Sequence, residues 1–301
     1  MTLRGRHRPC LVVFHAHPDD EAIFTGGTIA MAVAARWRVV LVVATSGEEG
    51  AKPDWLTDEL GPSRRSETRA SAQILGIERT EFFGYRDSGT DSSPNRGSLE
   101  PDGLQSSSLA LHAAPLHECV ERLRQVIDEE RPAALTSYDP RGIYGHPDHV
   151  RVHDIASAAV VGTECDLYEA TICRRTLRRL RDTLVARGLQ ESSWPQDLTD
   201  SIGTDERGVL VTLDVSPHIR KKRAAIAAHA SQVVEASSFM GLPPGAFHRL
   251  LETEWFIPVR SVDGRMARLL ATAGSSLRSA THDIHNSGLP TLDSGTALVI
   301  H

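Results

Sequence analysis

The sequence lacks any apolar run long enough to cross a membrane, and the apolar stretch after its basic first residues is too short for a signal peptide. Its four cysteines show no CxxC spacing, which indicates free thiols rather than a disulfide framework or a zinc knuckle. There is no internal repeat, P-loop, GxGxxG or GxSxG motif. The net charge of -6 argues against non-specific nucleic-acid binding. These absences predict a cytoplasmic protein that binds neither nucleic acid nor membrane.

Hydrophobic residues make up 40% of the 301 residues and charged residues 24%, which is typical of a soluble globular enzyme. Short apolar, β-branched runs predict buried strands at residues 11–14, 39–45, 80–83 and 133–137. Start and stop signals predict helices at residues 62–75, 115–130 and 150–161. This alternation predicts an α/β fold with a Rossmann-like, mostly parallel sheet and helices on both faces.

The predicted organisation has three portions along the chain. We expect residues 1–162 to form a Rossmann-like, metal-binding catalytic core. Residues 163–270 are expected to form a smaller C-terminal α+β portion that completes the same domain and the substrate pocket. Residues 271–301 are rich in Ser, Thr and Gly and are expected to form a flexible tail. The long aperiodic loop at residues 88–114 is expected to form a rim of the site.

A first cluster of polar residues, at residues 17–21, directly follows the first predicted strand. It holds one histidine and three acidic side chains, at the carboxyl end of a strand, where α/β sheets bind ligands. Pro18 fixes its own φ and restricts His17, which stiffens the loop. Taken alone, the three acids could equally be first-turn residues that a helix dipole favours.

A second cluster, at residues 144–149, follows the fourth predicted strand. Pro147 suits the first position of a helix, and Asp148 suits its first turn. His146 and His149 are three residues apart and can lie on one helix face. Since both clusters end parallel strands, we expect them to face each other across one crevice.

The two clusters together offer the ligands of a catalytic zinc site, which takes three protein ligands and keeps one position open for water. His17, Asp20 and His149 supply two nitrogens and one oxygen. Asp19 and His146 are left beside them, as a carboxylate that can accept a proton and an imidazole that can stabilise an oxyanion or protonate an amine. We therefore predict metal-assisted hydrolysis of an amide, with Zn²⁺ or Fe²⁺ as the metal.

Both clusters resemble the two signatures of the PIG-L/LmbE family of zinc-dependent N-deacetylases. The likeness extends through residues 64–67 and 84–89, and it covers roughly the first 160 residues well and the remainder loosely. The family removes acetyl groups from N-acetylglucosamine-type sugars and includes the deacetylase of mycothiol biosynthesis and the mycothiol S-conjugate amidase. The resemblance implies a small-molecule amino-sugar glycoconjugate as substrate and leaves a homo-oligomer open.

The resemblance also implies the metal ligands and the groups that handle protons. His17, Asp20 and His149 correspond to the zinc ligands of the family. Asp19 corresponds to the general base, and His146 to the general acid or oxyanion stabiliser.

Further roles concern the substrate and the support of the site. Tyr144 matches a tyrosine that polarises the substrate carbonyl in the family. Arg64 and Asp87 match residues that contact the sugar. We expect Asp148 to orient His146.

Three alternatives to the deacetylase stay open. A metal-dependent phosphoesterase could use the same acids, although two-metal sites usually need more carboxylate ligands. A non-catalytic metal- or sugar-binding relative would need neither Asp19 nor His146. The S-conjugate amidases usually carry a lysine soon after the first cluster, and residues 21–25 contain none.

Two further features lie outside the clusters. Glu48 and Glu49 follow the second predicted strand, and we expect them in a solvated loop rather than in the crevice. The resemblance places His229 near the site as a supporting residue.

Overall fold

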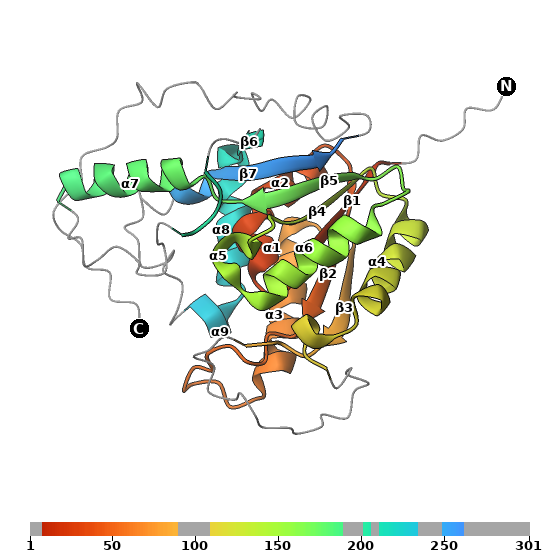
Figure 1. Ribbon diagram of the computed structural model, residues 1–301. Coiled ribbons are helices and arrows are strands. Elements are labelled where there is room, and N and C mark those ends of the chain that lie inside the picture. Colours follow the sequence, from red (N-terminus) through yellow and green to blue (C-terminus); the bar gives the residue numbers. More distant parts are fainter. Residues whose placement is uncertain (1–7, 90–108, 189–200, 206–210, 234–248, 262–301) are drawn as a thin grey trace.

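The computed structural model describes residues 8–89, 109–188, 201–205, 211–233 and 249–261. The expected tail at residues 271–301 and most of the expected rim at 88–114 lie outside the described residues. Within these residues the chain forms one seven-stranded sheet with the order β3-β2-β1-β4-β5-β7-β6 (Figure 1). The strands are β1 (Cys10–His15), β2 (Arg38–Thr45), β3 (Arg79–Tyr85), β4 (Ala134–Tyr138), β5 (Asp166–Thr171), β6 (Val211–Asp214) and β7 (Thr253–Arg260).

The first five strands pair in parallel, and β7 runs antiparallel to both β5 and β6. The predicted mostly parallel α/β sheet is therefore confirmed. Strand β1 lies at the middle of the parallel part, with Val13 opposite Leu41 of β2 and Thr136 of β4. The chain proceeds from β1 to β2 and β3 on one side and to β4 and β5 on the other, so the strand order reverses between β1 and β4. Ligands bind at such a reversal in open α/β sheets.

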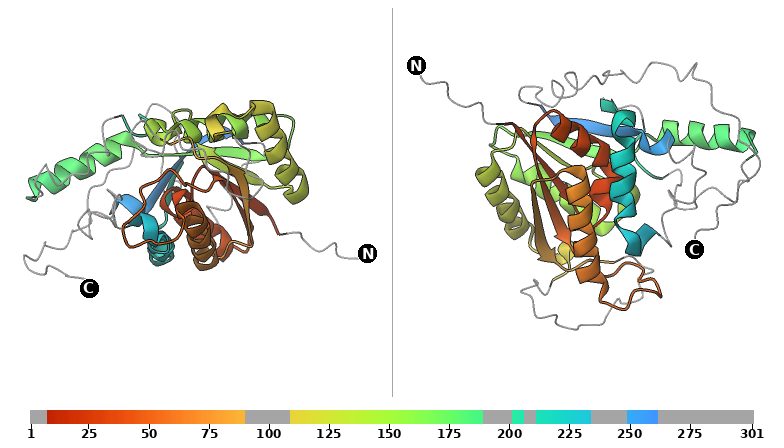
Figure 2. Two further views of the ribbon diagram at one scale, coloured as in Figure 1. Left: turned by 90° about the horizontal axis from the view of Figure 1, so that it is seen from below. Right: turned by 180° about the vertical axis from the view of Figure 1, so that it is seen from behind.

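Helices cover both faces of the sheet, as Figure 2 shows. Helices α4 and α6 pack together on one face, and α2, α3 and α8 pack on the other. The helices are α1 (Asp20–Phe24), α2 (Gly26–Ala34), α3 (Leu60–Leu75), α4 (Leu116–Glu130), α5 (Gly142–Gly145), α6 (Pro147–Ala159), α7 (Arg174–Ala186), α8 (Ile219–Ala227) and α9 (Ala230–Val233), with single 3₁₀ turns at Leu111–Ala113 and Ser216–His218.

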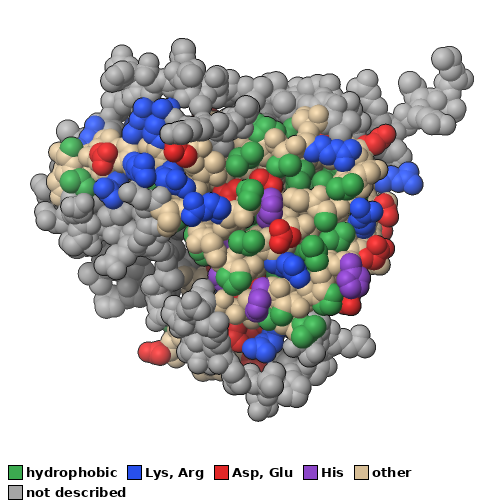
Figure 3. Space-filling model, in the orientation of Figure 1, with side chains coloured by type: hydrophobic (Ala, Val, Ile, Leu, Met, Phe, Trp, Pro, Cys, Tyr) green, Lys and Arg blue, Asp and Glu red, His purple; other side chains and the backbone are tan. Residues whose placement is uncertain are grey.

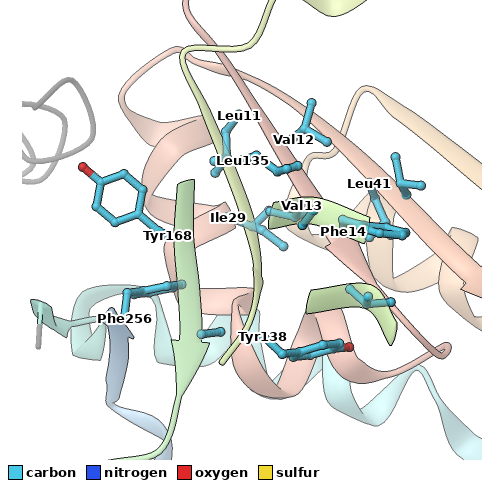
Figure 4. Packing of buried hydrophobic residues seen from close by; sticks show 14 of the residues in the cluster. Leu11, Val12, Val13, Phe14, Ile29, Leu41, Leu135, Tyr138, Tyr168 and Phe256 are labelled. Carbon is cyan, nitrogen blue, oxygen red and sulfur yellow. The ribbon is translucent and has the colours of Figure 1, made fainter. Parts of the chain in front are cut away.

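The core is centred on β1, whose apolar side chains are inaccessible to solvent because helices lie on both sides of it. Figure 4 shows Val13 and Phe14 of β1 beside Leu135 of β4 and Ile29 of α2. A strand buried on both faces needs apolar residues at consecutive positions, which is why residues 11–14 show no alternation.

Residues after 162 join this body through both the sheet and a buried ion pair. The Glu254 carboxylate of β7 accepts hydrogen bonds from the Gly27 N–H at 2.7 Å and from Lys222 Nζ of α8 at 2.7 Å. A carboxylate suits this place, because the N–H groups at the start of α2 have no partner within the helix. A Cβ on Gly27 would lie 2.3 Å from the Val215 Cβ, so only glycine allows this close packing.

Helix α7 extends away from the sheet, and only Leu177 of its residues is fully buried. Figure 3 shows Lys and Arg side chains gathered over this helix. None of the helices among the described residues has both the length and the apolarity that a membrane span requires.

Candidate metal centre and its catalytic groups

The two predicted clusters meet at the reversal of the strand order. Residues 17–20 leave the carboxyl end of β1, and the segment that follows β4 carries residues 144–149. The structure brings His17, Asp20 and His149 together as a buried group with their ligand atoms facing one another. The two clusters therefore meet at the ends of neighbouring parallel strands, as predicted.

The three ligand atoms form a nearly equilateral triangle. His17 Nδ1 lies 3.2 Å from His149 Nε2, and Asp20 Oδ2 lies 3.5 Å from His17 Nδ1 and 3.3 Å from His149 Nε2. Two ligands that are each about 2.0–2.1 Å from a tetrahedral zinc ion lie roughly 3.3–3.4 Å apart. The donor set and its spacing therefore fit a three-ligand cation site.

A second group of possible ligands, His17, Asp87 and His146, shares His17 with the first. In this second group, His17 Nε2 lies 3.5 Å from Asp87 Oδ1. A neutral histidine that binds a metal through Nδ1 carries its proton on Nε2. The two groups therefore require different nitrogens of the same His17 ring as the ligand atom. The more closely spaced group of His17, Asp20 and His149 is the better candidate.

The pocket around His17 is strongly negative. His17 Nε2 lies 3.3 Å from Asp148 Oδ2, and Asp20 and Asp87 also contact the ring. Burial opposes a charge on His17, but these carboxylates outweigh it and hold the pKa of His17 well above its usual value. Burial likewise opposes the charge of Asp20, yet His149 and His17 hold its pKa well below the usual range. Three carboxylates that meet at one buried point favour a bound cation.

Tyr138, at the end of β4, contacts two members of the triangle. Its hydroxyl donates to Asp20 Oδ2 at 2.7 Å, and its ring stacks on His149 with centroids 4.1 Å apart. The hydroxyl accepts from the Ala16 N–H at 3.0 Å and contacts His15 Nδ1 at 3.0 Å. Burial lowers the pKa of His15 to about 4, so this ring is neutral. Sequence reasoning missed both Tyr138 and His15.

Asp19 lies beside the triangle in a strained backbone conformation with φ 97°. Its carboxylate contacts Arg64 at 3.1 Å, and its N–H donates to Glu21 Oε2 at 3.1 Å. Burial raises the pKa of Asp19 to about 6, although Arg64 acts in the opposite direction. A carboxylate with such a pKa can both take and return a proton near neutral pH.

His146 caps the start of α6, and its ring stands edge-on to His17 with centroids 4.5 Å apart. Its Nδ1 accepts from the Asp148 N–H at 3.2 Å, so in the neutral ring Nε2 carries the proton. Burial, followed by the charges of His17 and His149, lowers the pKa of His146 to about 4.

Asp148 supports His146 through its backbone N–H, whereas its carboxylate was the group expected to orient the His146 ring. The Asp148 carboxylate contacts His17 and Ser88 instead, because α6 turns it toward β1. An imidazole with its pKa near 4 is neutral at pH 7, which favours His146 as an oxyanion stabiliser over His146 as a general acid, and both roles stay predictions.

Tyr144 lies on the short segment between β4 and α6, and its hydroxyl is 3.3 Å from His149 Nε2. This segment is held by Asp139, whose Oδ1 accepts from the N–H groups of Arg141 and Ile143. Ile143 has a φ of 63°, which is rare for a β-branched residue and indicates stored strain beside the site.

Arg64 and Asp87 are both buried and near the triangle. The Arg64 guanidinium donates to the carbonyls of Gly47 and Pro18 at 2.6 Å and contacts the Asp19 carboxylate. It therefore holds together the segments that follow β1 and β2. Asp87 Oδ1 accepts from the Gly89 N–H at 2.9 Å.

The glutamates after β2 differ from expectation. Glu48 Oε1 accepts from the Asp87 N–H at 2.8 Å, and Glu49 contacts Arg86 at 3.4 Å. One carboxylate oxygen on each glutamate is buried without a hydrogen-bond partner. The predicted solvated loop is therefore wrong, because these side chains turn toward the end of β3.

His229 reaches the site region from beyond α8. Its Nε2 lies 2.7 Å from the Oε1 of Glu21, which also accepts from the Ser71 hydroxyl at 2.5 Å. Since Glu21 Oε2 in turn accepts from the Asp19 N–H, the C-terminal portion supports the loop of the first cluster.

The sequence of this chain matches a known family and individual known proteins. The family model "PIG-L: GlcNAc-PI de-N-acetylase" matches residues 12–160. A 1D-myo-inositol 2-acetamido-2-deoxy-alpha-D-glucopyranoside deacetylase from Mycobacteroides abscessus is 36% identical over 274 residues, covering 84% of this chain and 93% of that relative.

Solved structures show that the fold is shared. The N,N'-diacetylchitobiose deacetylase of Pyrococcus horikoshii superposes with a TM-score of 0.52 at 19% identity, covering 85% of each chain. GalB of Pseudomonas putida, a 4-carboxy-2-hydroxymuconate hydratase, gives a TM-score of 0.50 at 17% identity, covering 83% of this chain and 96% of that one. The fold alone therefore does not fix the reaction. The family match and the relative at 36% identity show that this chain belongs to the PIG-L family of de-N-acetylases.

Proposed function

We propose that this protein is a metal-dependent deacetylase that removes the acetyl group from an N-acetylglucosamine-type glycoconjugate. The triangle of His17, Asp20 and His149, with Asp19 at its side, is the observation that carries the proposal. The M. abscessus relative and the P. horikoshii neighbour are both named for N-acetylated glucosamine derivatives. Their shared chemistry is the acetamido group of a glucosaminide, and that group is the proposed point of attack.

His17, Asp20 and His149 would hold the cation, and both Zn²⁺ and Fe²⁺ suit this donor set. When bound, such an ion lowers the pKa of a coordinated water toward neutrality and polarises an acyl oxygen. The contact of His17 Nε2 with Asp148 fixes the ring so that Nδ1 is the ligand atom.

Asp19 is the proposed general base. Its carboxylate accepts the proton of the attacking water and then returns a proton to the departing amine. Arg64 restrains this carboxylate from one side, and we propose that Arg64 acts on the substrate mainly through Asp19.

His146 is proposed to stabilise the oxyanion as a neutral hydrogen-bond donor. Its Nδ1 already accepts from the backbone, which leaves Nε2–H to donate to the developing charge. Tyr144 is proposed to donate to the substrate carbonyl from the His149 side. With both donors neutral, we assign the proton of the leaving amine to Asp19.

The remaining assignments concern the pocket and its setting. We propose that Asp87 accepts hydrogen bonds from sugar hydroxyls and that residues 163–270 complete the same domain, as the strands β5 to β7 suggest. A cytoplasmic location is proposed because the four cysteines, all of them buried, are free thiols.

A screen of N-acyl glucosaminides by mass spectrometry tests this function. The protein loaded with Zn²⁺ or Fe²⁺ should release acetate and a free amine from at least one N-acetylglucosaminide in a panel with inositol, sugar and lipid aglycones. A cysteinyl amide in the same panel tests the S-conjugate amidase. If no glucosaminide is deacetylated by loaded wild-type protein, the proposal is wrong. Asp19→Asn serves as the inactive control.

A further inference from the structure

A row of hydrogen bonds leads from His17 through Asp148, Ser88 and His112 to the surface, and sequence reasoning selected neither Ser88 nor His112 for a role in the site. His17 Nε2 contacts Asp148 Oδ2 at 3.3 Å. The Asp148 carboxylate accepts two hydrogen bonds from Ser88. The Ser88 N–H donates to Oδ2 at 2.9 Å, and the Ser88 hydroxyl donates to Oδ1. The Ser88 hydroxyl in turn contacts His112 Nδ1 at 2.7 Å and the His112 N–H at 3.2 Å. Asp148 is fully buried, whereas His112 is exposed.

The direction of each bond in this row follows from the number of protons available. A serine hydroxyl has one proton to donate and two lone pairs to accept with. Asp148, as a carboxylate, only accepts, so the Ser88 proton points to Asp148. The two lone pairs of Ser88 are then filled by the N–H and the Nδ1–H of His112. The row therefore has a single consistent arrangement, in which both Ser88 and His17 donate to Asp148.

The same segments are also joined through their backbones. The Leu111 N–H donates to the Arg86 carbonyl at 2.9 Å, and Arg86 pairs with Ala110 in a short parallel bridge. Ser88 thus lies just beyond β3 with His112 held beside it. Ser88 and Asp148 therefore link the segment that supplies His112 to His17.

We propose that Ser88 is a positioning residue of the metal centre, which holds the Asp148 carboxylate so that it fixes the His17 ring. An Asp148 with both oxygens engaged by Ser88 cannot turn away from His17. Partners of this kind behind a metal ligand usually change metal affinity by about 10–100-fold when they are removed. His112 completes the hydrogen bonding of Ser88. This inference rests on the proposed function, because it requires that His17 binds a cation.

Metal affinity measured by chelator competition tests the proposal without any substrate. Ser88→Ala is expected to weaken Zn²⁺ binding by about 10–100-fold, while Ser88→Thr, which keeps the hydroxyl, should restore most of it. His112→Ala should have a smaller effect in the same direction, because the His112 N–H remains. Matched controls are Ser66→Ala, an exposed serine on α3, and His117→Ala, an exposed histidine on α4. Neither control should change the affinity.

A double-mutant cycle shows whether Ser88 acts through Asp148. In an Asp148→Asn background, Ser88→Ala should cost much less affinity than in the wild type, because coupled residues are not additive. Thermal unfolding of the metal-free variants tests whether Ser88 has a purely structural role. In that case Ser88→Ala would lower the melting temperature and leave the affinity for Zn²⁺ unchanged. If Ser88→Ala binds Zn²⁺ as tightly as the wild type, this inference alone is wrong. A wild-type protein that binds no divalent ion would overturn it together with the proposed function.

Discussion

The ring of Tyr138 lies flat on the ring of His149, with centroids 4.1 Å apart and an interplanar angle of 8°. The hydroxyl of the same tyrosine donates to Asp20. One fully buried side chain thus orients an imidazole of α6 and a carboxylate of α1, which follow different strands.

Tyr138→Phe should separate the two contacts, because phenylalanine keeps the stacking and removes the donor to Asp20. We expect Zn²⁺ affinity to fall by roughly tenfold or more. The metal-free protein should lose about 1–3 kcal/mol of stability, since the buried Ala16 N–H loses its acceptor. Chelator competition and denaturant unfolding measure the two effects. Unchanged affinity in a folded variant would show that the hydroxyl does not support Asp20.

Asp19→Asn should abolish turnover and spare the metal centre. The base is lost, so kcat is expected to fall by about 10²-fold or more. The ligand triangle does not include Asp19, and asparagine tolerates its positive φ at least as well as aspartate. Metal content and circular dichroism should therefore match the wild type. An Asp19→Asn protein with full activity would exclude Asp19 as the base.

The dependence of kcat/KM on pH should have an acidic limb that belongs to Asp19. The pKa of this carboxyl is raised to about 6, and the base works only when ionised. Activity is therefore expected to rise with pH through this region and to level off above it. His146→Gln should lower kcat at all pH values, since the neutral ring with its pKa near 4 does not titrate in the working range. A basic limb that disappears in His146→Gln would instead show that His146 works protonated.

His229→Ala should strongly destabilise the protein, because it leaves the buried Glu21 carboxylate without its charged partner. The expected cost is about 3–5 kcal/mol. Burial opposes a charge on His229, but Glu21 outweighs it and raises the pKa of His229 above 6.5. The pair's contribution is therefore fully present below pH 6.5 and is lost as pH rises through the pKa of the folded protein.

Urea unfolding at several pH values between about 6 and 9 checks this sign. The wild type should lose stability across the range more steeply than His229→Ala. Adding Glu21→Gln to His229→Ala should recover part of the loss, because the unpaired charge is then removed. Equal slopes for wild type and His229→Ala would show that this pair does not set the pH dependence.

Much of the fold and the metal triangle could be predicted because both depend on local signals. Apolar runs marked the parallel strands, and His17, Asp20 and His149 follow two strands that turned out to be neighbours. Tyr138 could not be selected, since a tyrosine at the end of a strand looks like an ordinary core residue. The contact between Ser88 and Asp148 depends on how the segment after β3 approaches the start of α6, which no local sequence pattern predicts. The half-buried position of Glu48 has the same origin, since its partner is the N–H of Asp87.

The metal content of purified protein tests the central claim most directly. After exposure to Zn²⁺ and removal of the excess, elemental analysis should find about one ion per chain in the wild type, as expected of a three-ligand catalytic site. The folded variant His149→Ala should retain almost none, whereas His146→Gln should retain the wild-type amount. A His149→Ala protein with full metal occupancy, or a His146→Gln protein that loses the ion, would contradict the assignment of His17, Asp20 and His149 as the ligands.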